Sequence, residues 1–306
     1  MDLTLRPARP DDADAVTAFT RETWPDRDID DYLPRVFREW AESDDDDQRT
    51  LVAETDGAVV GTIQGVVCSP REAWVQGLRI DPAHRGRGVA RELTEAVLDW
   101  ARDRGASVCR NIVFSWNVAS LGLARRVGFR PCTEFRWAVV QADADATPSL
   151  EVTADAGAGW SFWTASDARD HLRGLALDAD RAWVLSELRP ADLDRAAAAD
   201  GLFVVRDGGT RGVALRNRAF EYRADDDAES ERWTEYAVGA WADAEAARAL
   251  VRAVARDAAS LDADRARVLV PETGRFVTDA AAARADVSGH PDFVLSADLT
   301  DPSVGA

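Results

Sequence analysis

The chain consists of two similar halves, which restricts the folds that it can adopt. Residues 51–57 read LVAETDG and residues 202–208 read LFVVRDG, and a second run with strand-forming residues follows each segment. The two segments lie 151 residues apart. An Asp-Gly pair between two such runs is a strong signal for a β-hairpin. The sequence therefore predicts the same hairpin in both halves.

A matching helix follows each predicted hairpin. Residues 89–97 read VARELTEAV and residues 246–254 read AARALVRAV, 157 residues apart, with apolar side chains at helical spacing. The strands expected after these helices are 108–114 and 135–140 in the first half, and 266–270 and 293–297 in the second. This order of elements predicts an α/β fold (α+β, with a mixed sheet) made of two modules in tandem.

The predicted modules are contiguous stretches of sequence, residues 1–141 and residues 160–306. The linker expected between them, residues 142–159, is rich in Ala, Asp, Thr, Pro and Gly. The acidic run 224–231 is expected to be a loop between strands. The run 44–47 is expected to be a solvated loop tip rather than a metal cluster.

The charge of the chain restricts its partners. Asp and Glu total 55 against 37 Lys and Arg, for a net charge of -18, and every basic residue of the 37 is Arg. Such an acidic surface repels a phosphate backbone, which argues against nucleic acid as a partner. Two explanations of the acidity remain open. One is a coding bias toward Ala, Arg, Gly and Asp, and the other is a halophilic adaptation to high intracellular salt.

The sequence shows no segment for membrane insertion or secretion. No apolar run approaches the roughly 18–20 residues that cross a bilayer, and the first residues show no secretory signal. Cys and His residues lie far apart, without the close spacing of a zinc site or a disulfide framework. We therefore expect a cytoplasmic protein without a resident metal, although carboxylate ligands for Mg²⁺ stay open. The Cys and His residues in question are Cys68, Cys109, Cys132, His84, His171 and His290.

The glycine turn, residues 81–88, connects a predicted strand to the helix at 89–97. Its last four residues are Arg85, Gly86, Arg87 and Gly88. The N–H groups in the first turn of a helix have no intrahelical partner, and the helix dipole favours an anion there. The two glycines allow close approach of a phosphate, and the two arginines add positive charge. The strand–turn–helix context favours a pyrophosphate site over the alternative, an ordinary surface turn.

Three motifs resemble the GCN5-related N-acetyltransferase (GNAT) family. The family's acyl-CoA signature, Arg/Gln-x-x-Gly-x-Gly/Ala, is met by the residues from Arg85 to Ala90. Its later signature, Asn-x-x-Ala/Ser followed by Gly-Phe, resembles the stretch from Asn117 to Phe129. Residues 5–12 resemble the family's first strand and the start of its first helix. The resemblance covers about residues 3–140.

The resemblance implies direct transfer of an acetyl group from acetyl-CoA to a primary amine of a small molecule or amino acid. It implies that the main chain of Leu78, Arg79 and Ile80 binds the pantetheine arm and that Asn117 lies near the thioester. The residues implied to hold the pyrophosphate are Arg85, Gly86, Arg87, Gly88, Val89 and Ala90. The alternatives are a non-catalytic acyl-CoA sensor and a protein N-terminal or lysine acetyltransferase, and a homodimer is one assembly open to the chain.

The chain departs from the family pattern at two positions. Many members carry a Tyr, the acid for the departing thiolate, where this chain has Ala124, and a Glu where it has Trp74. Glu72 is therefore the candidate base, with a water relay or an exposed Glu at the start of a strand as the alternatives. Tyr32 or a bound water is the candidate acid.

The acceptor pocket is expected between the first helices, where Asp30, Asp31, Tyr32 and Trp40 lie. This stretch resembles the histidine N-acetyltransferase-like members of the family. A carboxylate beside an aromatic wall suits an amine cation. Tyr32 and Trp116 are the candidate substrate residues, and the alternative for both is ordinary aromatic packing.

The second half lacks the features of the glycine turn. At the offset of 157, residues 242–245 read Ala-Asp-Ala-Glu where residues 85–88 read Arg-Gly-Arg-Gly. Two carboxylates suit the start of a helix but repel a pyrophosphate. The sequence therefore predicts a degenerate second module that packs on the first and does not bind acyl-CoA.

Overall fold

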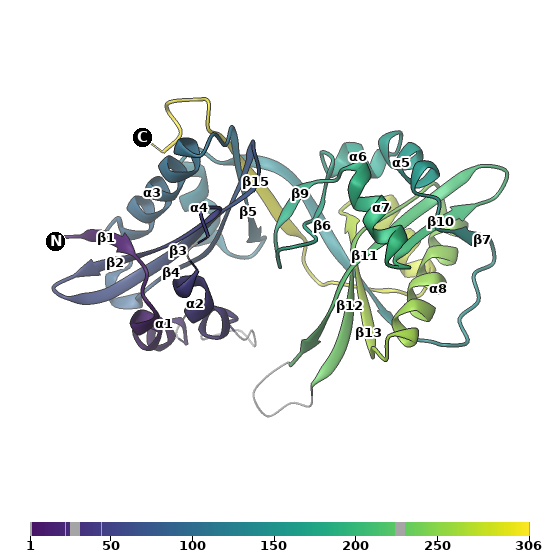
Figure 1. Ribbon diagram of the computed structural model, residues 1–306, viewed down its shortest axis with the longest axis horizontal. Helices are drawn as coiled ribbons and strands as arrows, with labels where there is room; N and C mark the ends of the chain where they lie inside the picture. The colour runs from purple at the N-terminus through teal and green to yellow at the C-terminus, as the bar shows by residue number, and fades with distance from the viewer. Residues whose placement is uncertain (1, 22, 25–30, 44, 224–229, 306) are drawn as a thin grey trace. The chain divides into compact units, whose positions relative to one another are not determined.

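The computed structural model describes residues 2–21, 23–24, 31–43, 45–223 and 230–305 (Figure 1). The chain divides into two compact units. Unit 1 consists of Met1–Val113, Asn117–Pro131 and Val294–Ala306, and unit 2 consists of Phe114–Trp116 and Cys132–Phe293. Asp30 lies outside the described residues, as do residue 44 and residues 224–229 of the two acidic runs.

The units are not the contiguous stretches that we expected. Residues 132–141 belong to unit 2, because β6 (Arg130–Gln141) pairs antiparallel with β13 (Arg265–Pro271) over seven residues. The end of the chain from Val294 belongs to unit 1. The expected boundaries at 141 and 160 are therefore wrong for the closing strands, because sequence order does not specify which neighbour a strand pairs with.

The expected linker, residues 142–159, is partly structured. It contains β7 (Glu151–Thr153), which pairs antiparallel with β10 (Leu202–Arg206), and α5 (Ala156–Thr164) begins within it. Asp155 caps α5, because its side chain accepts a hydrogen bond from the N–H of Ala158 at 2.9 Å. The linker prediction was wrong here because three residues are too few to show an alternating pattern.

The sheet of unit 1 contains five consecutive strands and the last strand of the chain. The order is β1, β2, β3, β4, β5 and β15, with β4 and β5 parallel. The predicted hairpin is confirmed between β2 and β3, where Asp56 and Gly57 have φ angles of +51° and +78°. The bounds are β1 (Thr4–Pro7), β2 (Gln48–Thr55), β3 (Ala58–Ser69), β4 (Glu72–Ile80), β5 (Val108–Phe114) and β15 (Asp292–Asp298).

Helices cover both faces of this sheet (Figure 1). The predicted apolar face of α3 (Val89–Asp103) is buried, and added Cβ atoms at Gly61 and Gly65 would contact Leu93 and Val97 of that helix. The opposite face carries a core formed with α1 (Ala13–Thr20) and α2 (Leu33–Glu42). The remaining helical segments of unit 1 are η1 (Pro10–Asp12), η2 (Pro82–His84) and α4 (Val118–Arg126).

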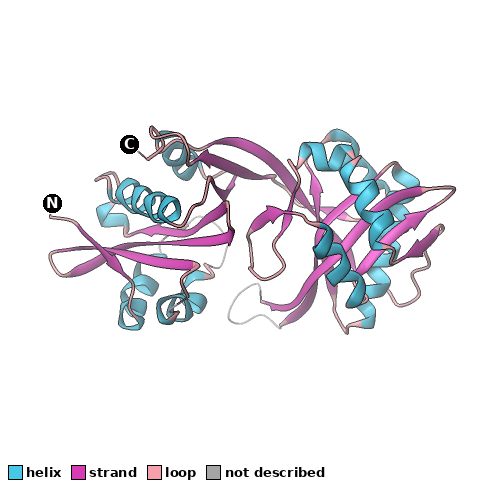
Figure 2. Cartoon of the chain, turned by 45° about the horizontal axis from the view of Figure 1, so that its top comes forward, coloured by secondary structure: helices cyan, strands magenta, loops and turns pink. Residues whose placement is uncertain are grey.

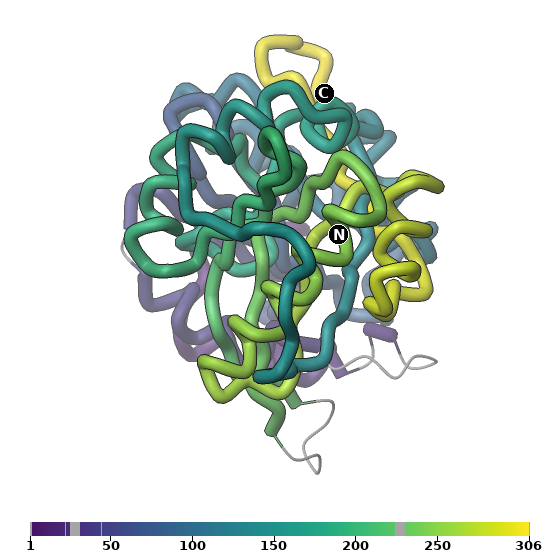
Figure 3. Tube along the Cα trace, turned by 90° about the vertical axis from the view of Figure 1, so that its right-hand side faces the viewer, coloured from purple at the N-terminus to yellow at the C-terminus, as the bar shows by residue number. Residues whose placement is uncertain are grey.

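The C-terminal segment after β15 packs on unit 1 (yellow in Figure 3). Arg102 of α3 donates a hydrogen bond from Nε to the carbonyl oxygen of Leu299 at 3.2 Å. The N–H of Gly305 donates to the carbonyl oxygen of Val127, also at 3.2 Å. The last residues of the chain therefore form hydrogen bonds with the C-terminal ends of α3 and α4.

The strands of unit 2 follow one another in the order β6, β13, β12, β11, β10 and β7, with both parallel and antiparallel pairs. Figure 2 shows the strands in magenta and the helices in cyan. A hairpin at Asp207 and Gly208 joins β10 to β11, as predicted, and β12 is parallel to β13. Helices α5 and α8 lie on opposite faces, because an added Cβ at Gly159 would contact Val213 and one at Gly212 would contact Leu250. The further elements are β11 (Thr210–Tyr222), β12 (Glu231–Trp241), α6 (Asp167–His171), β8 (Leu175–Leu177), β9 (Leu185–Glu187), α7 (Pro190–Ala198), α8 (Ala244–Ser260), α9 (Gly274–Ala282) and β14 (Asp286–Val287).

Candidate active site

The two parallel strands of unit 1 separate toward their carboxyl ends. β4 and β5 pair over only three residues, and the last pair is Trp74 with Arg110. β4 continues to Ile80 and β5 to Phe114, and these described residues form no further pairs with each other. Ligands of open α/β sheets bind outside the carboxyl ends of parallel strands. The separated strand ends, β4 after Trp74 and β5 after Arg110, are therefore the candidate site.

A β-bulge redirects β4 at this position. Between two of its pairs with β3, β4 carries one residue more than β3 does. Gly77 lies in the bulge with a φ of +66°, and a Cβ added there would lie 2.7 Å from the Trp40 ring. Both observations require glycine. The bulge sets the course of Leu78, Arg79 and Ile80, the residues expected to bind the pantetheine arm.

The glycine turn ends at an uncapped helix. Gly88 has a φ of +91° and occupies the N-cap position of α3, where no side chain caps the first turn. Gly86 has a φ of +74°, and Arg85, Gly86, Arg87 and Gly88 are all exposed. The N–H groups of this first turn are therefore left for solvent or for a bound anion.

Asn117 and Trp116 adjoin in the sequence but are grouped with different units. Asn117 caps α4, because its Oδ1 accepts a hydrogen bond from the N–H of Ser120 at 3.1 Å. Trp116 stacks on Phe114 with ring centroids 5.2 Å apart. Both residues therefore have structural contacts, and their roles toward the thioester and the substrate stay predictions.

The side chain of Arg79 binds a carboxylate outside the glycine turn. It forms a bidentate pair with Asp31, at 2.7 Å from Nε and 3.1 Å from Nη2. Its guanidinium lies 4.5 Å from the centroid of the Trp24 ring. Asp31 already neutralises this buried guanidinium, so the side chain of Arg79 adds no free positive charge to the glycine turn.

Tyr32 lies beside the bulge. Its ring packs edge-on against the Trp40 ring, with the ring centroids 6.0 Å apart. Its hydroxyl interacts with the main chain of Gly77. Burial raises the pKa of Tyr32, and the positive charge of Arg79 partly counteracts this effect. Tyr32 is therefore neutral at physiological pH, and it stands on the α2 side of the separated strand ends.

Glu72 lies at the start of β4, before the strands separate. Its side chain is buried, and its Oε1 lies 2.5 Å from Nη1 of Arg110. Its Oε2 accepts a hydrogen bond from the hydroxyl of Ser69 at 3.0 Å. The alternative of an exposed Glu is wrong, because the residue is only 8% exposed. Since both oxygens have partners, the contacts argue for a structural carboxylate and against a free base.

Comparisons with known proteins bear directly on this site. Residues 13–129 match the Acetyltransferase (GNAT) family, a range that includes the glycine turn and the Asn117 motif. Streptothricin acetyltransferase of Streptomyces lavendulae is 32% identical over 157 aligned residues, covering 42% of this chain and 82% of that protein. The chain belongs to the GCN5-related N-acetyltransferase family. It is accordingly an acyltransferase.

A second sequence relative of this acetyltransferase matches a shorter stretch, and a solved structure matches nearly the whole chain. Histidine N-acetyltransferase of Xenopus tropicalis is 35% identical over 79 residues, covering 26% of this chain and 24% of that protein. Among solved structures, the GCN5-related N-acetyltransferase of Sphaerobacter thermophilus superposes with a TM-score of 0.62 at 14% identity. That superposition covers 97% of this chain and 96% of the other. It shows a shared fold over nearly the whole acetyltransferase, unit 2 included.

In the described part of unit 2 of the acetyltransferase, the turn before α8 is no counterpart of the glycine turn. Only Ala242 and Asp243 connect β12 to α8, whereas eight residues connect β4 to α3. Asp243 caps α8 by accepting hydrogen bonds from the N–H groups of Glu245 and Ala246, each at 3.0 Å. Arg211 lies 2.6 Å from the Asp243 carboxylate. The expected match of residues 242–245 with 85–88 is therefore wrong, because Ala244 and Glu245 already belong to the helix.

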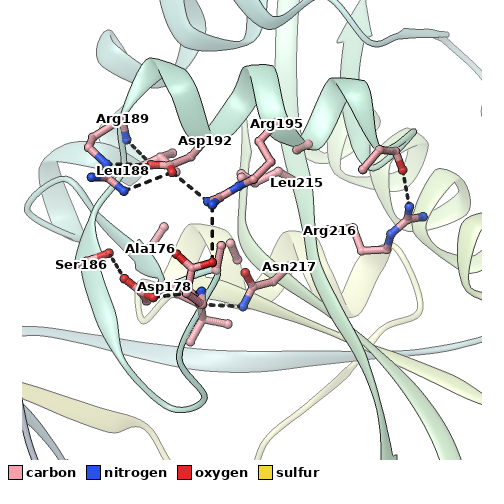
Figure 4. Close-up of a pocket in the computed structure, with 16 residues that line it drawn as sticks. Ala176, Asp178, Ser186, Leu188, Arg189, Asp192, Arg195, Leu215, Arg216 and Asn217 are labelled. Carbon is pink, nitrogen blue, oxygen red and sulfur yellow. Dashed lines mark hydrogen bonds and ion pairs between the residues drawn. The ribbon is translucent and has the colours of Figure 1, made fainter. Parts of the chain in front are cut away.

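Unit 2 does contain a cavity of about 220 Å³ beside α7 (Figure 4). The polar groups drawn there bind one another. Ser186 donates to Oδ2 of Asp178 at 2.9 Å, and Asn217 donates to the main-chain oxygen of the same residue at 3.1 Å. Arg195 lies 2.9 Å from Asp192. Because these lining groups bind one another, the cavity does not indicate a particular ligand.

The described residues offer little for metal chemistry. No group of three or more His, Cys, Asp or Glu side chains among them is arranged to hold a metal ion.

Within the same part of the chain, no helix is both long and apolar enough to cross a membrane.

Sequence reasoning missed a row of polar side chains in the acetyltransferase. Thr50, Gln64 and Gln76 lie side by side on β2, β3 and β4 and are joined by hydrogen bonds. The available signal was a polar residue at the same position in three successive apolar strands. Finding it required the strand register, which the hairpin turn fixes only for β2 and β3.

Proposed function

We propose that the protein transfers an acetyl group from acetyl-CoA to a primary amine of a small molecule or an amino acid. The observation that carries the proposal is the uncapped start of α3 beside the separated ends of β4 and β5. The named relatives add support, since streptothricin acetyltransferase and histidine N-acetyltransferase carry a small acceptor in their names.

The glycine turn fits the pyrophosphate of CoA. A Cβ added at Gly86 would meet nothing within 4 Å, and one at Gly88 would meet only a Glu92 oxygen at 4.0 Å. The space next to both glycines is therefore open, although the positive φ angles exclude most side chains. The residues from Arg85 to Ala90 would hold the diphosphate, and the main chain after the Gly77 bulge would hold the pantetheine arm.

Acetyl-CoA supplies an acyl group activated as a thioester. The amine nitrogen attacks the carbonyl carbon, a C–N bond forms, and the C–S bond breaks. The amine loses one proton, and the departing thiolate gains one. The chain contributes mainly by holding the two substrates in line.

Water is the better proton carrier at both steps. Glu72 is paired with Arg110, and Trp74 stands where many family members have a Glu, so no described carboxylate on β4 is available as a base. An ordinary thiol has a pKa of about 8.5. The pKa of Tyr32 is raised above that of a free phenol, so transfer of its proton to a thiolate is unfavourable. We therefore assign Tyr32 to the wall of the acceptor pocket.

A thiol-release assay on the full chain tests the proposal. Acetyl-CoA is supplied with streptothricin, L-histidine, L-lysine and simple alkyl amines, each at low and at molar salt. Acceptor-dependent release with at least one of them supports the proposed function. Saturable CoA binding without release across the whole panel would instead indicate an acyl-CoA sensor.

Two charge reversals test the location of the cofactor site. Arg85→Glu is expected to weaken CoA binding by at least tenfold, because it replaces a charge-assisted contact by repulsion. Arg248→Glu makes the same change of charge on the exposed face of α8 and is expected to leave binding within about twofold. Equal affinity of both variants and the wild type would rule out the glycine turn as the site.

We also propose that unit 2 is a degenerate module that does not bind CoA. The Asp243 cap already satisfies the N–H groups that would receive a phosphate, and its carboxylate repels one. Calorimetric titration of the full chain should therefore give one CoA per chain. Two equivalent sites per chain would contradict this assignment.

A further inference from the structure

A row of polar side chains crosses the α2-facing side of the sheet in unit 1. Thr50 pairs with Gln64 in the register of β2 and β3, and Gln64 pairs with Gln76 in the register of β3 and β4. Thr50 is 6% exposed and Gln64 is 1% exposed. Burying such groups is costly unless they form hydrogen bonds, so their orientations are set by the bonds available to them.

The bonds give the row a fixed direction. The hydroxyl of Thr50 donates to the carbonyl oxygen of Trp40 on α2 at 3.3 Å, so its oxygen is left to accept a bond. Gln64 therefore presents its amide nitrogen to Thr50, at 3.2 Å. Its own oxygen then accepts from the amide nitrogen of Gln76 at 2.7 Å. Because the proton of Thr50 is already committed, neither amide can turn over without losing a bond.

The direction of the row leaves one acceptor atom at its end. No described residue donates a hydrogen bond to Oε1 of Gln76, and the residue is only partly buried. Gln76 lies two residues after Trp74, the last residue of β4 that pairs with β5, and directly before the bulge at Gly77. The free amide oxygen therefore stands where the separated strand ends begin.

We propose that Oε1 of Gln76 accepts a hydrogen bond from the nitrogen of the acceptor amine and selects primary amines. This inference rests on the proposed acetyl transfer. Gln64 and Thr50 are positioning residues, since they act only by holding the amide of Gln76 with its oxygen outward.

The selectivity follows from the hydrogen atoms on the attacking nitrogen. A neutral primary amine has two N–H bonds, so one can point to Gln76 while the other carries the proton that is lost on acyl transfer. A neutral secondary amine has only one, so it must give up either the bond to Gln76 or the exit of its proton. The held N–H also turns the lone pair toward the acyl carbon.

The experiment compares an acceptor found in the thiol-release assay with its N-methyl analogue, on the full chain. In the wild type, kcat/KM should be at least tenfold higher for the primary amine. Gln76→Met keeps the length of the side chain and removes the acceptor oxygen. This variant should lose about 10- to 100-fold in kcat/KM for the primary amine, with little change for the N-methyl analogue and for the KM of acetyl-CoA.

Gln48→Met serves as the matched control. Gln48 accepts only a long bond of 3.4 Å from Gln64 on the side away from Gln76, so its replacement should leave kcat/KM within about twofold. Thr50→Val removes the hydroxyl that sets the direction of the row. It should reduce the preference for the primary amine while Gln76 itself is unchanged. Thermal unfolding of each variant confirms that it is folded.

The outcomes separate the two proposals. Acceptor-dependent thiol release by the wild type, with the same preference for primary amines in Gln76→Met, would overturn the role of Gln76 and leave the proposed function standing. Equal use of primary and N-methyl amines by the wild type would overturn the selectivity without any variant. If the wild type releases no thiol with any acceptor, the proposed function fails, and this inference fails with it.

Discussion

Glu72→Gln distinguishes a structural carboxylate from a catalytic base. The Glu72 carboxylate lies 2.5 Å from the Arg110 guanidinium, and the two side chains are 10% and 11% exposed. Breaking a buried pair from one side costs roughly 3–5 kcal/mol, because the remaining charge is left without compensation. Gln keeps the shape of the side chain and one acceptor oxygen. We therefore expect the free energy of unfolding to fall by about 3 kcal/mol.

The assay measures stability and turnover on the same preparation. Urea unfolding at 25 °C gives the loss of stability, and thiol release under conditions where the variant is folded gives kcat. A structural carboxylate predicts a kcat within about threefold of the wild type. A general base typically contributes a factor of 10²–10⁴, so a folded variant with kcat reduced 100-fold or more would refute the reasoning.

Two further variants complete this test. Replacing both partners, with Glu72→Gln and Arg110→Met together, should recover much of the lost stability, since no uncompensated charge then remains. Glu42→Gln removes a carboxylate from an exposed position at the end of α2 and should change the free energy of unfolding by less than about 0.5 kcal/mol.

Three other predictions follow from described contacts. Gly77→Ala should destabilise the chain by about 1–3 kcal/mol and raise the KM for acetyl-CoA, because alanine disfavours a φ of +66° and its Cβ would meet Trp40; urea unfolding and thiol release measure both effects. Asp243→Ala should cost about 1 kcal/mol in urea unfolding through loss of a helix cap, without creating a second CoA site by calorimetry. Burial raises the pKa of Asp292 to about 6 from 3.8. The folded state thus holds a proton that the unfolded state releases, so stability is lost as pH rises from about 4 to 6; Asp292→Asn should remove that loss, gaining at most about 3 kcal/mol at pH 7 in urea unfolding.

The local elements of the fold could be predicted from the sequence. The Asp-Gly turns at 56–57 and 207–208 indicated their hairpins, because glycine tolerates the positive φ angle that Gly57 and Gly208 adopt in these tight turns. The buried face of α3 followed from apolar spacing alone. These signals are local, since each depends on residues within one or two turns of chain.

The non-local features were beyond such reasoning. Nothing in residues 130–141 shows that β6 pairs with β13, because an alternating apolar pattern fits many partners equally well. For the same reason, the sequence did not predict that Glu72 pairs with Arg110 or that Arg79 pairs with Asp31. The members of these pairs lie 38 and 48 residues apart. Glu72 was therefore assigned as the candidate base from its position near a motif, whereas its pair with Arg110 argues for a structural role.

The starts of α3 and α8 differ in whether the first N–H groups of the helix are left for an anion. Both helices follow a strand that is parallel to the next strand of its sheet. At α3 the N-cap is a glycine with no side chain, and two exposed arginines stand close by in the turn. At α8 the N-cap is Asp243, whose carboxylate takes the N–H groups, and Arg211 pairs with that carboxylate. The chain has a net charge of -18, yet the arginines of the turn before α3 are left available to a ligand. At α8 the positive charge of Arg211 is neutralised by the carboxylate of Asp243. The two helix starts thus differ in the N-cap and in the length of the preceding turn, and the proposed cofactor site is assigned to α3 on that difference.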